Sequence, residues 1–250
     1  MGVLNVTPDS FSDGGRFAAP GAAVERARAM VDEGADLIDV GGESTRPGAA
    51  AVDIDEELRR TIPVIEAVAS LGVPVSIDTR KATVAKAALD AGAVIVNDVS
   101  AGSFDDAMLP LVADRGVPIV LMHMRGTPET MDSLTIYDDV VADVRSELAS
   151  RVDAATNAGV SEVWVDPGLG FAKTADQSIE LLRRVDDLRG LGRPLVIGPS
   201  RKRFIGGELA DRREGTLAVV AWCAAHHVDV VRVHDVLQAR RVVDTIARLA

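Results

Sequence analysis

The chain has a single cysteine, Cys223, among its 250 residues. One cysteine cannot form an internal disulfide or a cysteine-rich metal site, and this usage is typical of a reducing cytoplasm. The sequence also lacks any apolar run close to the roughly 20 residues that a membrane-spanning helix needs. Its N-terminus shows no charged region followed by an apolar stretch, which excludes a typical secretory signal. We therefore expect a soluble, cytoplasmic protein with no membrane partner.

Positive charge is scarce as well. The chain carries 27 basic residues against 38 acidic ones, which gives a formal net charge of -11. Because nucleic acids and anionic membranes require a basic face, this balance argues against either as a partner. The sequence is 47% hydrophobic and 26% charged, an ordinary globular balance. No Pro/Ser-rich linker or low-complexity tract divides the chain, so we expect residues 1–250 to form a single domain.

Short apolar runs alternate with longer amphipathic stretches along the whole chain. Eight runs predict β-strands, at 2–6, 37–41, 73–77, 94–99, 117–122, 163–165, 195–198 and 230–233. Helical periodicity predicts helices at 22–34, 53–71, 80–91, 105–115, 138–158, 175–190, 202–225 and 236–249. Four of the predicted helices end at a glycine that we expect to be left-handed, namely Gly34, Gly72, Gly92 and Gly116.

Eight strand–helix units predict an α/β protein that folds as a single (β/α)₈ TIM barrel. A doubly wound open sheet is the structural alternative, and periodicity alone does not exclude it. The chain begins almost within its first strand, so we expect nothing to cover the floor of the barrel.

Polar residues follow every predicted strand, at the end where such a barrel builds its active site. Asp78, Asn97 and Asp166 follow three of the strands and supply two carboxylates and an amide. This set suits the edge of a flat heterocycle rich in N–H donors, such as a 2-amino-4-oxo pyrimidine ring. The alternative is that these carboxylates are structural and pair with Arg80 or Lys173.

A second group of polar residues lies where the last predicted strand meets the first. Arg232 and His234 are two residues apart in a strand, so their side chains project the same way. Together with Asn5 they predict an anion pocket, in which the Asn5 amide oxygen could ligate Mg²⁺ alongside phosphate oxygens and water. Lys202 begins a predicted helix, where its charge opposes the helix dipole, so we expect it to have a specific partner.

The motifs that carry these residues resemble those of the dihydropteroate synthases. They are MGVLNVTPDSFSDGG (1–15), DVGGESTRPG (39–48), SID (76–78), VNDVS (96–100), LMHMRGT (121–127), DPGLGFAK (166–173), SRKRF (200–204) and RVHDV (232–236). The resemblance runs from the first residue to the last helix. It implies an alkyl-group transferase that condenses (7,8-dihydropterin-6-yl)methyl diphosphate with 4-aminobenzoate in folate biosynthesis. It also implies Mg²⁺ as cofactor, a homodimer and sensitivity to sulfonamides.

The resemblance assigns roles to individual residues of this sequence. It implies that the pterin is bound by Asp78, Asn97, Met122, Asp166 and Lys202. Diphosphate would be bound by Asn5, Arg232 and His234, with Asn5 also at the metal. The 4-aminobenzoate pocket would comprise Thr45, Arg46, Pro47, Phe171 and Ser200, beside Lys202. The implied catalytic set is Asn5, Asp13, Lys202, Arg232 and His234, and Phe11 and Asp13 match a mobile first loop. Nothing in the sequence holds these Gly-rich loops, so we expect bound Mg²⁺ and diphosphate to order them.

Three features depart from the family pattern. Relatives usually carry a short leader before the motif that begins here at Met1. Pro199 stands where Ala or Thr is more familiar, and Arg125 stands where Gln is common. Two other functions remain open at this stage. A pterin-dependent methyltransferase would keep the pterin carboxylates but would not need Arg232 and His234, and a catalytically silent pterin-binding paralogue would have degenerate loops.

Overall fold

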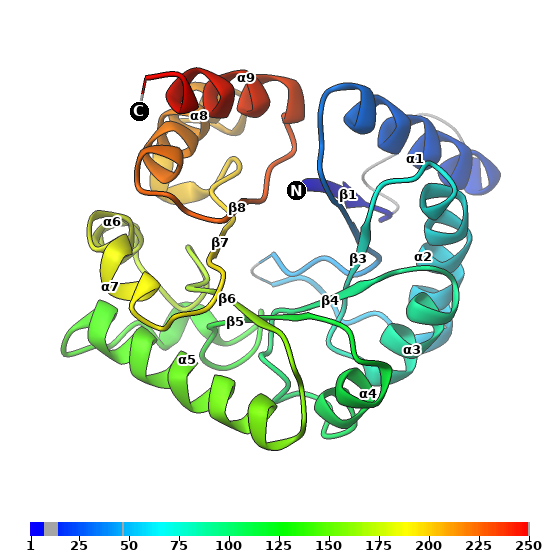
Figure 1. Ribbon diagram of the computed structural model, residues 1–250, viewed down its shortest axis with the longest axis horizontal. Helices are drawn as coiled ribbons and strands as arrows, with labels where there is room; N and C mark the ends of the chain where they lie inside the picture. Colours follow the sequence, from blue (N-terminus) through cyan, green and yellow to red (C-terminus); the bar gives the residue numbers. More distant parts are fainter. Residues whose placement is uncertain (8–14, 47, 250) are drawn as a thin grey trace.

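The computed structural model describes residues 1–7, 15–46 and 48–249, and its strands form a ring inside a layer of helices (Figure 1). All pairings are parallel, in the order β1-β2-β3-β4-β5-β6 and β7-β8. The strands are β1 (Gly2–Asn5), β2 (Ile38–Gly41), β3 (Val75–Asp78), β4 (Ile95–Asp98), β5 (Ile119–Met122), β6 (Val163–Asp166), β7 (Val196–Ile197) and β8 (Val230–Val231).

Two isolated bridges close the ring. Val165 pairs with Leu195 between β6 and β7, and Gly2 pairs with Val233 beyond β8. The Val3 amide donates to the Val233 carbonyl at 2.9 Å across this second seam. The prediction of a TIM barrel is confirmed, and the open doubly wound sheet is excluded.

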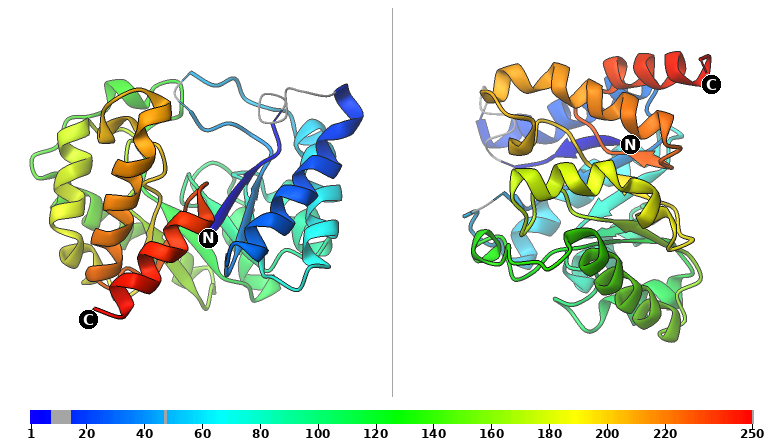
Figure 2. Two further views of the ribbon diagram at one scale, coloured as in Figure 1. Left: turned by 90° about the horizontal axis from the view of Figure 1, so that it is seen from above. Right: turned by 90° about the vertical axis from the view of Figure 1, so that its left-hand side faces the viewer.

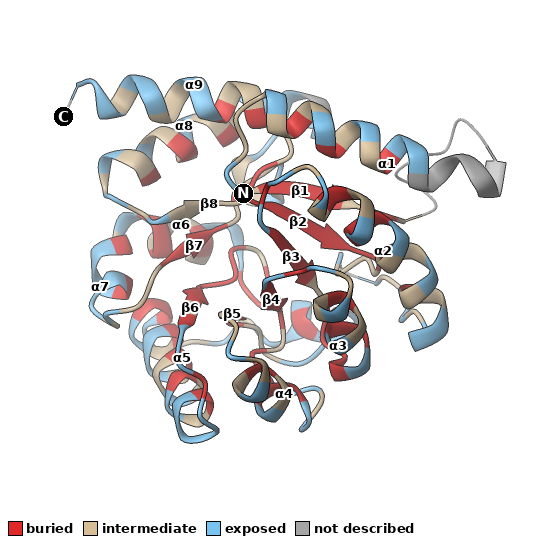
Figure 3. Cartoon of the chain, turned by 45° about the vertical axis from the view of Figure 1, so that its right-hand side comes forward, coloured by how far each residue is buried: buried red, intermediate tan, exposed pale blue. Residues whose placement is uncertain are grey.

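Helices cover the outside of the ring, with their polar faces toward solvent (Figure 3). They are α1 (Gly15–Asp32), α2 (Ile54–Ala69), α3 (Ala82–Asp90), α4 (Met108–Arg115), α5 (Val140–Asn157), α6 (Ala175–Arg183), α7 (Val185–Arg189), α8 (Arg212–Ala225) and α9 (Val236–Ala247). Short 3₁₀ helices lie at η2 (Met131–Ser133), η3 (Arg203–Ile205) and η4 (Leu209–Asp211). The predicted left-handed glycines are confirmed, since φ is positive at Gly34, Gly72, Gly92 and Gly116.

Three predicted helices are wrong in extent. The helix predicted at 22–34 begins earlier, since α1 starts at Gly15. Helix 202–225 does not begin at Lys202, because Gly206 and Gly207, with φ of 82° and 67°, interrupt the chain before α8 starts at Arg212. Lys202 has an extended backbone and precedes only the short η3, so the argument from the helix dipole does not apply to it. The predicted helix 175–190 is two helices, α6 and α7, separated at Arg184.

The inside of the barrel is filled at the end where the strands begin. Met1 and Trp164 pack there against the buried cluster Leu37, Ile95, Val120 and Val196. The Met1 ammonium also donates to the Val231 carbonyl at 3.0 Å. Side chains therefore fill the inside of the barrel just above its floor, and the expectation that no segment covers the floor from below stays a prediction. In the described part of the chain, no helix is long and apolar enough to cross a membrane.

Candidate active site

The register of the strands decides which side chains point into the barrel. Residues opposite each other in a parallel pair share a face, and residues two apart in a strand share it too. Asn5 lies opposite Gly41, Gly41 opposite Asp78, and Asp78 opposite Asn97. Met122 likewise lies opposite Asp166. These residues form one inward-facing layer near the C-terminal ends of the strands.

A cavity opens above this layer. The loop after β2 borders it, at the end of the barrel away from the C-terminus (Figure 2, left). The cavity is lined by Thr45, Asp78, Asn97, Val99, Met122, Asp166, Gly168, Leu169, Phe171, Gly198, Lys202 and Arg232. The structure therefore brings together the five residues predicted to bind a pterin, and places Thr45 and Phe171 beside them.

Arg232 lies between two carboxylates at the bottom of the cavity. Its Nε donates to Asp39 at 2.6 Å, and one terminal nitrogen donates to Asp78 at 2.7 Å. Asp39 is fully buried and also accepts bonds from the Ser76 hydroxyl at 2.6 Å and the Asn97 amide at 3.1 Å. Sequence reasoning missed Asp39 as a site residue. The available signal was a charged residue in the middle of an otherwise apolar strand.

The alternative in which the carboxylates pair with Arg80 or Lys173 is wrong. Arg80 pairs with Glu43, and Lys173 bonds to His123 and backbone carbonyls. Asp166 accepts a bond from the Gly168 amide at 2.7 Å.

Burial shifts the titration of the groups that face the cavity. It raises the pKa of Asp78 above its ordinary value against the attraction of Arg232, and it raises the pKa of Asp166 in the same way. Burial lowers the pKa of Lys202 to about 8. Among the described residues, Lys202 has no carboxylate within ion-pair distance, and its ammonium lies 4.1 Å from the centre of the Phe171 ring. The Asn97 amide donates to Asp39, which leaves the amide oxygen of Asn97 as an acceptor.

His234 connects β8 to the residues beside it. Its Nδ1 lies 2.8 Å from the Ser200 hydroxyl, and its Nε2 lies 3.4 Å from the Asn5 amide nitrogen. If the Asn5 amide donates, the imidazole is neutral with its proton on Nδ1. Burial lowers the pKa of His234 to about 4, and the charges of Arg232 and Arg46 act in the same direction. His234 is therefore uncharged at neutral pH until an anion approaches it.

The loop after β2 is held at its base, contrary to the expectation that nothing fixes it. Glu43 accepts a bond from the Val52 amide at 3.2 Å and pairs with Arg80 and Lys81. Near the tip, the Gly48 amide donates to the carbonyl of Pro128 at 3.2 Å. Between these points, Thr45 lines the cavity and Arg46 is exposed.

Three residues of the predicted site lie outside the described part of the chain, namely Phe11, Asp13 and Pro47.

The oxygen ligands available where β8 meets β1 suit a Mg²⁺ ion that binds together with phosphate. Within residues 1–7, 15–46 and 48–249, no group of three or more His, Cys, Asp or Glu side chains could hold a metal ion. Asn5, at the end of β1, turns its amide nitrogen toward His234, and its amide oxygen is a single hard ligand of the kind that Mg²⁺ accepts. One protein ligand leaves most of an octahedron to phosphate oxygens and water.

The chain is similar to proteins of known activity along its length. The family model described as "Pterin binding enzyme" matches residues 1–234. The dihydropteroate synthase of Synechocystis sp. is 50% identical over 244 residues, which cover 94% of this chain and 84% of the relative. A solved Xanthomonas albilineans dihydropteroate synthase with 4-aminobenzoic acid aligns with a TM-score of 0.94 at 44% identity, covering 100% of this chain and 92% of that one. A structure of that enzyme in complex with 7,8-dihydropteroate aligns with a TM-score of 0.91 at 40% identity, with the same coverage.

Proposed function

Because the chain belongs to the pterin-binding enzyme family and, within it, to the dihydropteroate synthases, we propose that the barrel cavity is the site of its reaction. The reaction transfers a dihydropterin-methyl group from its diphosphate to the amine of 4-aminobenzoate. The observation that carries the assignment is the convergence of Asp78, Asn97, Asp166 and Lys202 on one cavity. We further propose that residues 1–250 act as a single domain, in the cytoplasm.

The pterin ring is proposed to bind by its hydrogen-bonding edge. Asp78, Asp166 and the Asn97 amide oxygen are acceptors for the ring N–H and NH₂ groups, and Lys202 is a donor for the ring carbonyl. Met122 lies on the same inward-facing layer and lines the cavity, which gives the flat ring an apolar surface to rest on.

The diphosphate is proposed to bind where β8 meets β1. Asn5, Ser200 and His234 are already joined there by hydrogen bonds, and Arg232 lies two residues before His234. An anion beside His234 favours the charged imidazole, so its pKa rises from about 4 as the diphosphate binds. When bound, Mg²⁺ would be held by Asn5 and the phosphate oxygens, and it would neutralise charge on the leaving group.

Departure of the diphosphate leaves positive charge on the pterin-methyl group. Three carboxylates, the buried Asp39 and Asp166 and the half-buried Asp78, lie in or beside the cavity with two cations, Arg232 and Lys202, so this part of the cavity tolerates added positive charge. The amine that attacks is an aniline, which is neutral at pH 7. A strong general base is therefore not needed to create the nucleophile.

4-Aminobenzoate is proposed to bind at the mouth of the cavity. Thr45 and Phe171 line this region, and Ser200 bonds to His234 behind it. Arg46 is the exposed cation on the loop after β2, and with Pro47 it completes the proposed pocket. A charged group of this kind suits the carboxylate of the substrate.

The deciding experiment measures diphosphate release with and without 4-aminobenzoate. Release that requires 4-aminobenzoate is expected, whereas release without it would contradict the proposal. Chelation should stop turnover and added Mg²⁺ should restore it, and full activity in excess EDTA would refute the metal's role. Calorimetry should show that Asp78→Ala and Asp166→Ala lose pterin binding in a folded barrel. Unchanged pterin affinity in both variants would remove the assignment of the ring edge.

The order of binding gives a second test. Mg²⁺ with diphosphate should tighten 4-aminobenzoate about tenfold or more, a coupling of roughly 1.4 kcal/mol, because the anion gives new contacts to the exposed Arg46, which lies between the two fixed points of the loop after β2. Titration of 4-aminobenzoate with and without Mg²⁺ and diphosphate measures this coupling, and Arg46→Ala and Asp13→Ala should reduce it. Equal affinity under both conditions would mean that the 4-aminobenzoate site is preformed. We also propose a homodimer, which sedimentation would detect.

A further inference from the structure

The loop between β6 and α6 forms one wall of the cavity through Gly168 and Phe171. It packs directly on the end of β5, where a Cβ at Gly168 would collide with the carbonyl oxygen of His123. The backbone is left-handed at Gly168 and also at Ala172, where φ is 49°. A loop with this backbone needs outside contacts to keep it in place.

One buried side chain of the loop itself joins two of its carbonyls to the end of β5. Lys173 is 8% exposed, and its ammonium donates to the carbonyls of Phe171 at 2.9 Å and Gly168 at 3.2 Å. The third partner is Nδ1 of His123, at 2.9 Å. The carbonyl of His123 lies farther away, at 3.5 Å, so the three protons of the ammonium are satisfied by neutral acceptors. Among the described residues, no carboxylate lies within ion-pair distance of Lys173.

The direction of the bonds fixes the state of His123. Because Nδ1 accepts from Lys173, the ring carries its proton on Nε2, which lies 2.9 Å from Glu147 on α5. Burial and the charge of Lys173 lower the pKa of His123 to about 3, so the neutral ring is its state at ordinary pH. The neutral ring therefore connects the buried lysine to a carboxylate whose side chain is 42% exposed.

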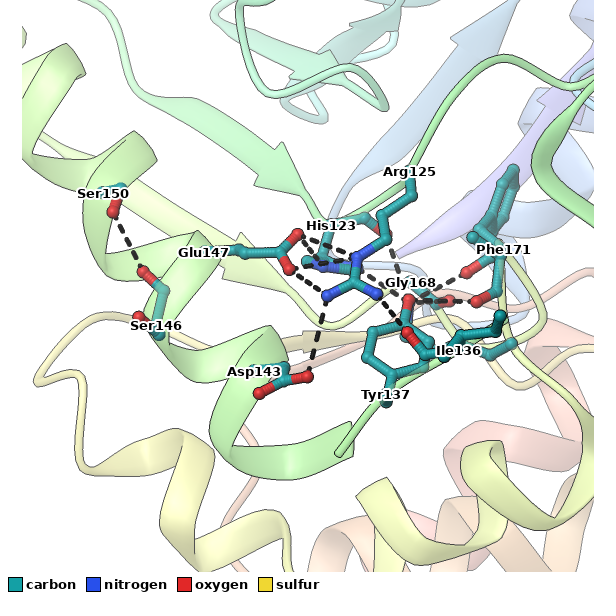
Figure 4. A network of polar contacts seen from close by, with 12 residues as sticks. His123, Arg125, Ile136, Tyr137, Asp143, Ser146, Glu147, Ser150, Gly168 and Phe171 are labelled. Atoms are coloured by element: carbon teal, nitrogen blue, oxygen red, sulfur yellow. Dashed lines mark hydrogen bonds and ion pairs between the residues drawn. The ribbon is translucent and has the colours of Figure 1, made fainter. Parts of the chain in front are cut away.

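The network returns to the same loop by a second route (Figure 4). Arg125 forms an ion pair with Glu147, and its guanidinium lies 3.9 Å from the centre of the Tyr137 ring. The Tyr137 hydroxyl donates to the carbonyl of Ala172 at 3.0 Å. Both ends of the network therefore terminate on loop carbonyls. At one end Lys173 bonds to the carbonyls of Gly168 and Phe171, and at the other Tyr137 bonds to the carbonyl of Ala172, the residue after Phe171.

We propose that Lys173 is a positioning residue for the reaction, which holds Gly168 and Phe171 in place and thereby sets the affinity for 4-aminobenzoate. His123, at the end of β5, and Glu147, on α5, support it. The proposal rests on the proposed function, because it takes Phe171 as part of the 4-aminobenzoate pocket. Asp78 and Asp166 lie at the ends of strands and Lys173 bonds to neither, although Asp166 also accepts a bond from the Gly168 amide at 2.7 Å.

The test compares Lys173→Met, which keeps the length of the side chain, with Lys86→Met as the matched control. Lys86 is an exposed lysine of α3 that pairs only with Asp90. Lys173→Met should raise the KM for 4-aminobenzoate about tenfold or more, with less than a twofold change in the calorimetric Kd for the pterin diphosphate. A residue that only stabilises the fold would lower the active fraction, and hence kcat, without this split. Lys86→Met should change neither constant.

Glu147→Gln provides a second variant at the solvent end of the network, should Lys173→Met fail to fold. It should raise the KM for 4-aminobenzoate about threefold. An unchanged KM in folded Lys173→Met, or equal increases in KM for both substrates, overturns the positioning role. If only Glu147→Gln folds, an unchanged KM for 4-aminobenzoate in that variant overturns it as well. Absence of activity in the unmutated protein would instead overturn the proposed function.

Discussion

Lys81 and Lys173 are equally buried, at 8% exposure, and each holds a loop that borders the cavity, yet their partners differ in kind. The Lys81 ammonium forms ion pairs with Glu43 and Glu57 and donates to the Val52 carbonyl at 2.8 Å. Within the described residues, the Lys173 ammonium has only neutral partners, which are two loop carbonyls and the imidazole and carbonyl of His123.

The difference in partners indicates that Lys81 stabilises the fold, whereas Lys173 positions a loop of the cavity wall. Two carboxylates compensate the charge of Lys81, and both of them lose an ion-pair partner if Lys81 is removed. Nothing of opposite charge touches Lys173, and burial lowers its pKa to about 7. A buried ammonium of this kind is costly. Its presence beneath a loop of the cavity wall is better explained by the position it gives the loop than by stability.

The largest expected effect is on stability, from Lys81→Met. It leaves the buried Glu57 without its cation, while Glu43 keeps Arg80, and this should cost about 3–5 kcal/mol. Lys173→Met should cost less than about 2 kcal/mol, since it leaves only neutral groups unpaired and removes a buried charge. Urea unfolding at pH 7 measures both, with Lys86→Met as the exposed control. Equal losses at the two buried sites would contradict the comparison.

The second effect is a difference in pH dependence. The folded pKa of Lys173, about 7, lies below its ordinary value of 10.5, so between these values the unfolded chain binds more protons than the folded one. Stability from this group therefore rises with pH across that window. The unmutated protein should gain about 2 kcal/mol relative to Lys173→Met between pH 7 and pH 9. Parallel stability curves for the two proteins would show that Lys173 titrates normally.

Much of the fold was predictable because its signals are local. Apolar runs identify all eight strands, and Gly34, Gly72, Gly92 and Gly116 end their helices with positive φ as predicted. The error at 202–225 arose because helical periodicity was followed across two adjacent glycines, which themselves signalled the interruption.

The candidate site was predictable only in part, because strand ends show where a residue lies but not what it contacts. Asp78, Asn97 and Asp166 were expected to meet, and they do. The pairing of Arg232 with Asp39 joins residues that lie 193 positions apart, and only the closed barrel brings them together. The Lys173 network likewise depends on His123 and on α5, which no spacing in the sequence connects to it.

Arg232 offers the same comparison within the cavity. It forms ion pairs with two carboxylates, Asp39 and Asp78, as Lys81 does with two glutamates. Asp39→Asn keeps the shape but weakens a charge-assisted bond to Arg232 and disturbs the amide of Asn97. The affinity for the pterin diphosphate should fall about tenfold, or roughly 1.4 kcal/mol. Calorimetry measures this, and Ser76→Ala, which removes a neutral bond to the same carboxylate, should have a smaller effect. Unchanged affinity in Asp39→Asn would mean that Asp78 alone orients Arg232.

The smallest effect is expected at Arg125, where the family commonly has Gln. The carboxylate of Glu147 is 42% exposed, so water screens its ion pair with Arg125. Arg125→Gln should therefore cost only about 0.5 kcal/mol in urea unfolding. The bond between His123 and Glu147 at 2.9 Å does not involve the guanidinium. The KM for 4-aminobenzoate should consequently change less than twofold. A tenfold increase in this KM, with normal stability, would show that the outer ion pair rather than the buried lysine positions the cavity wall.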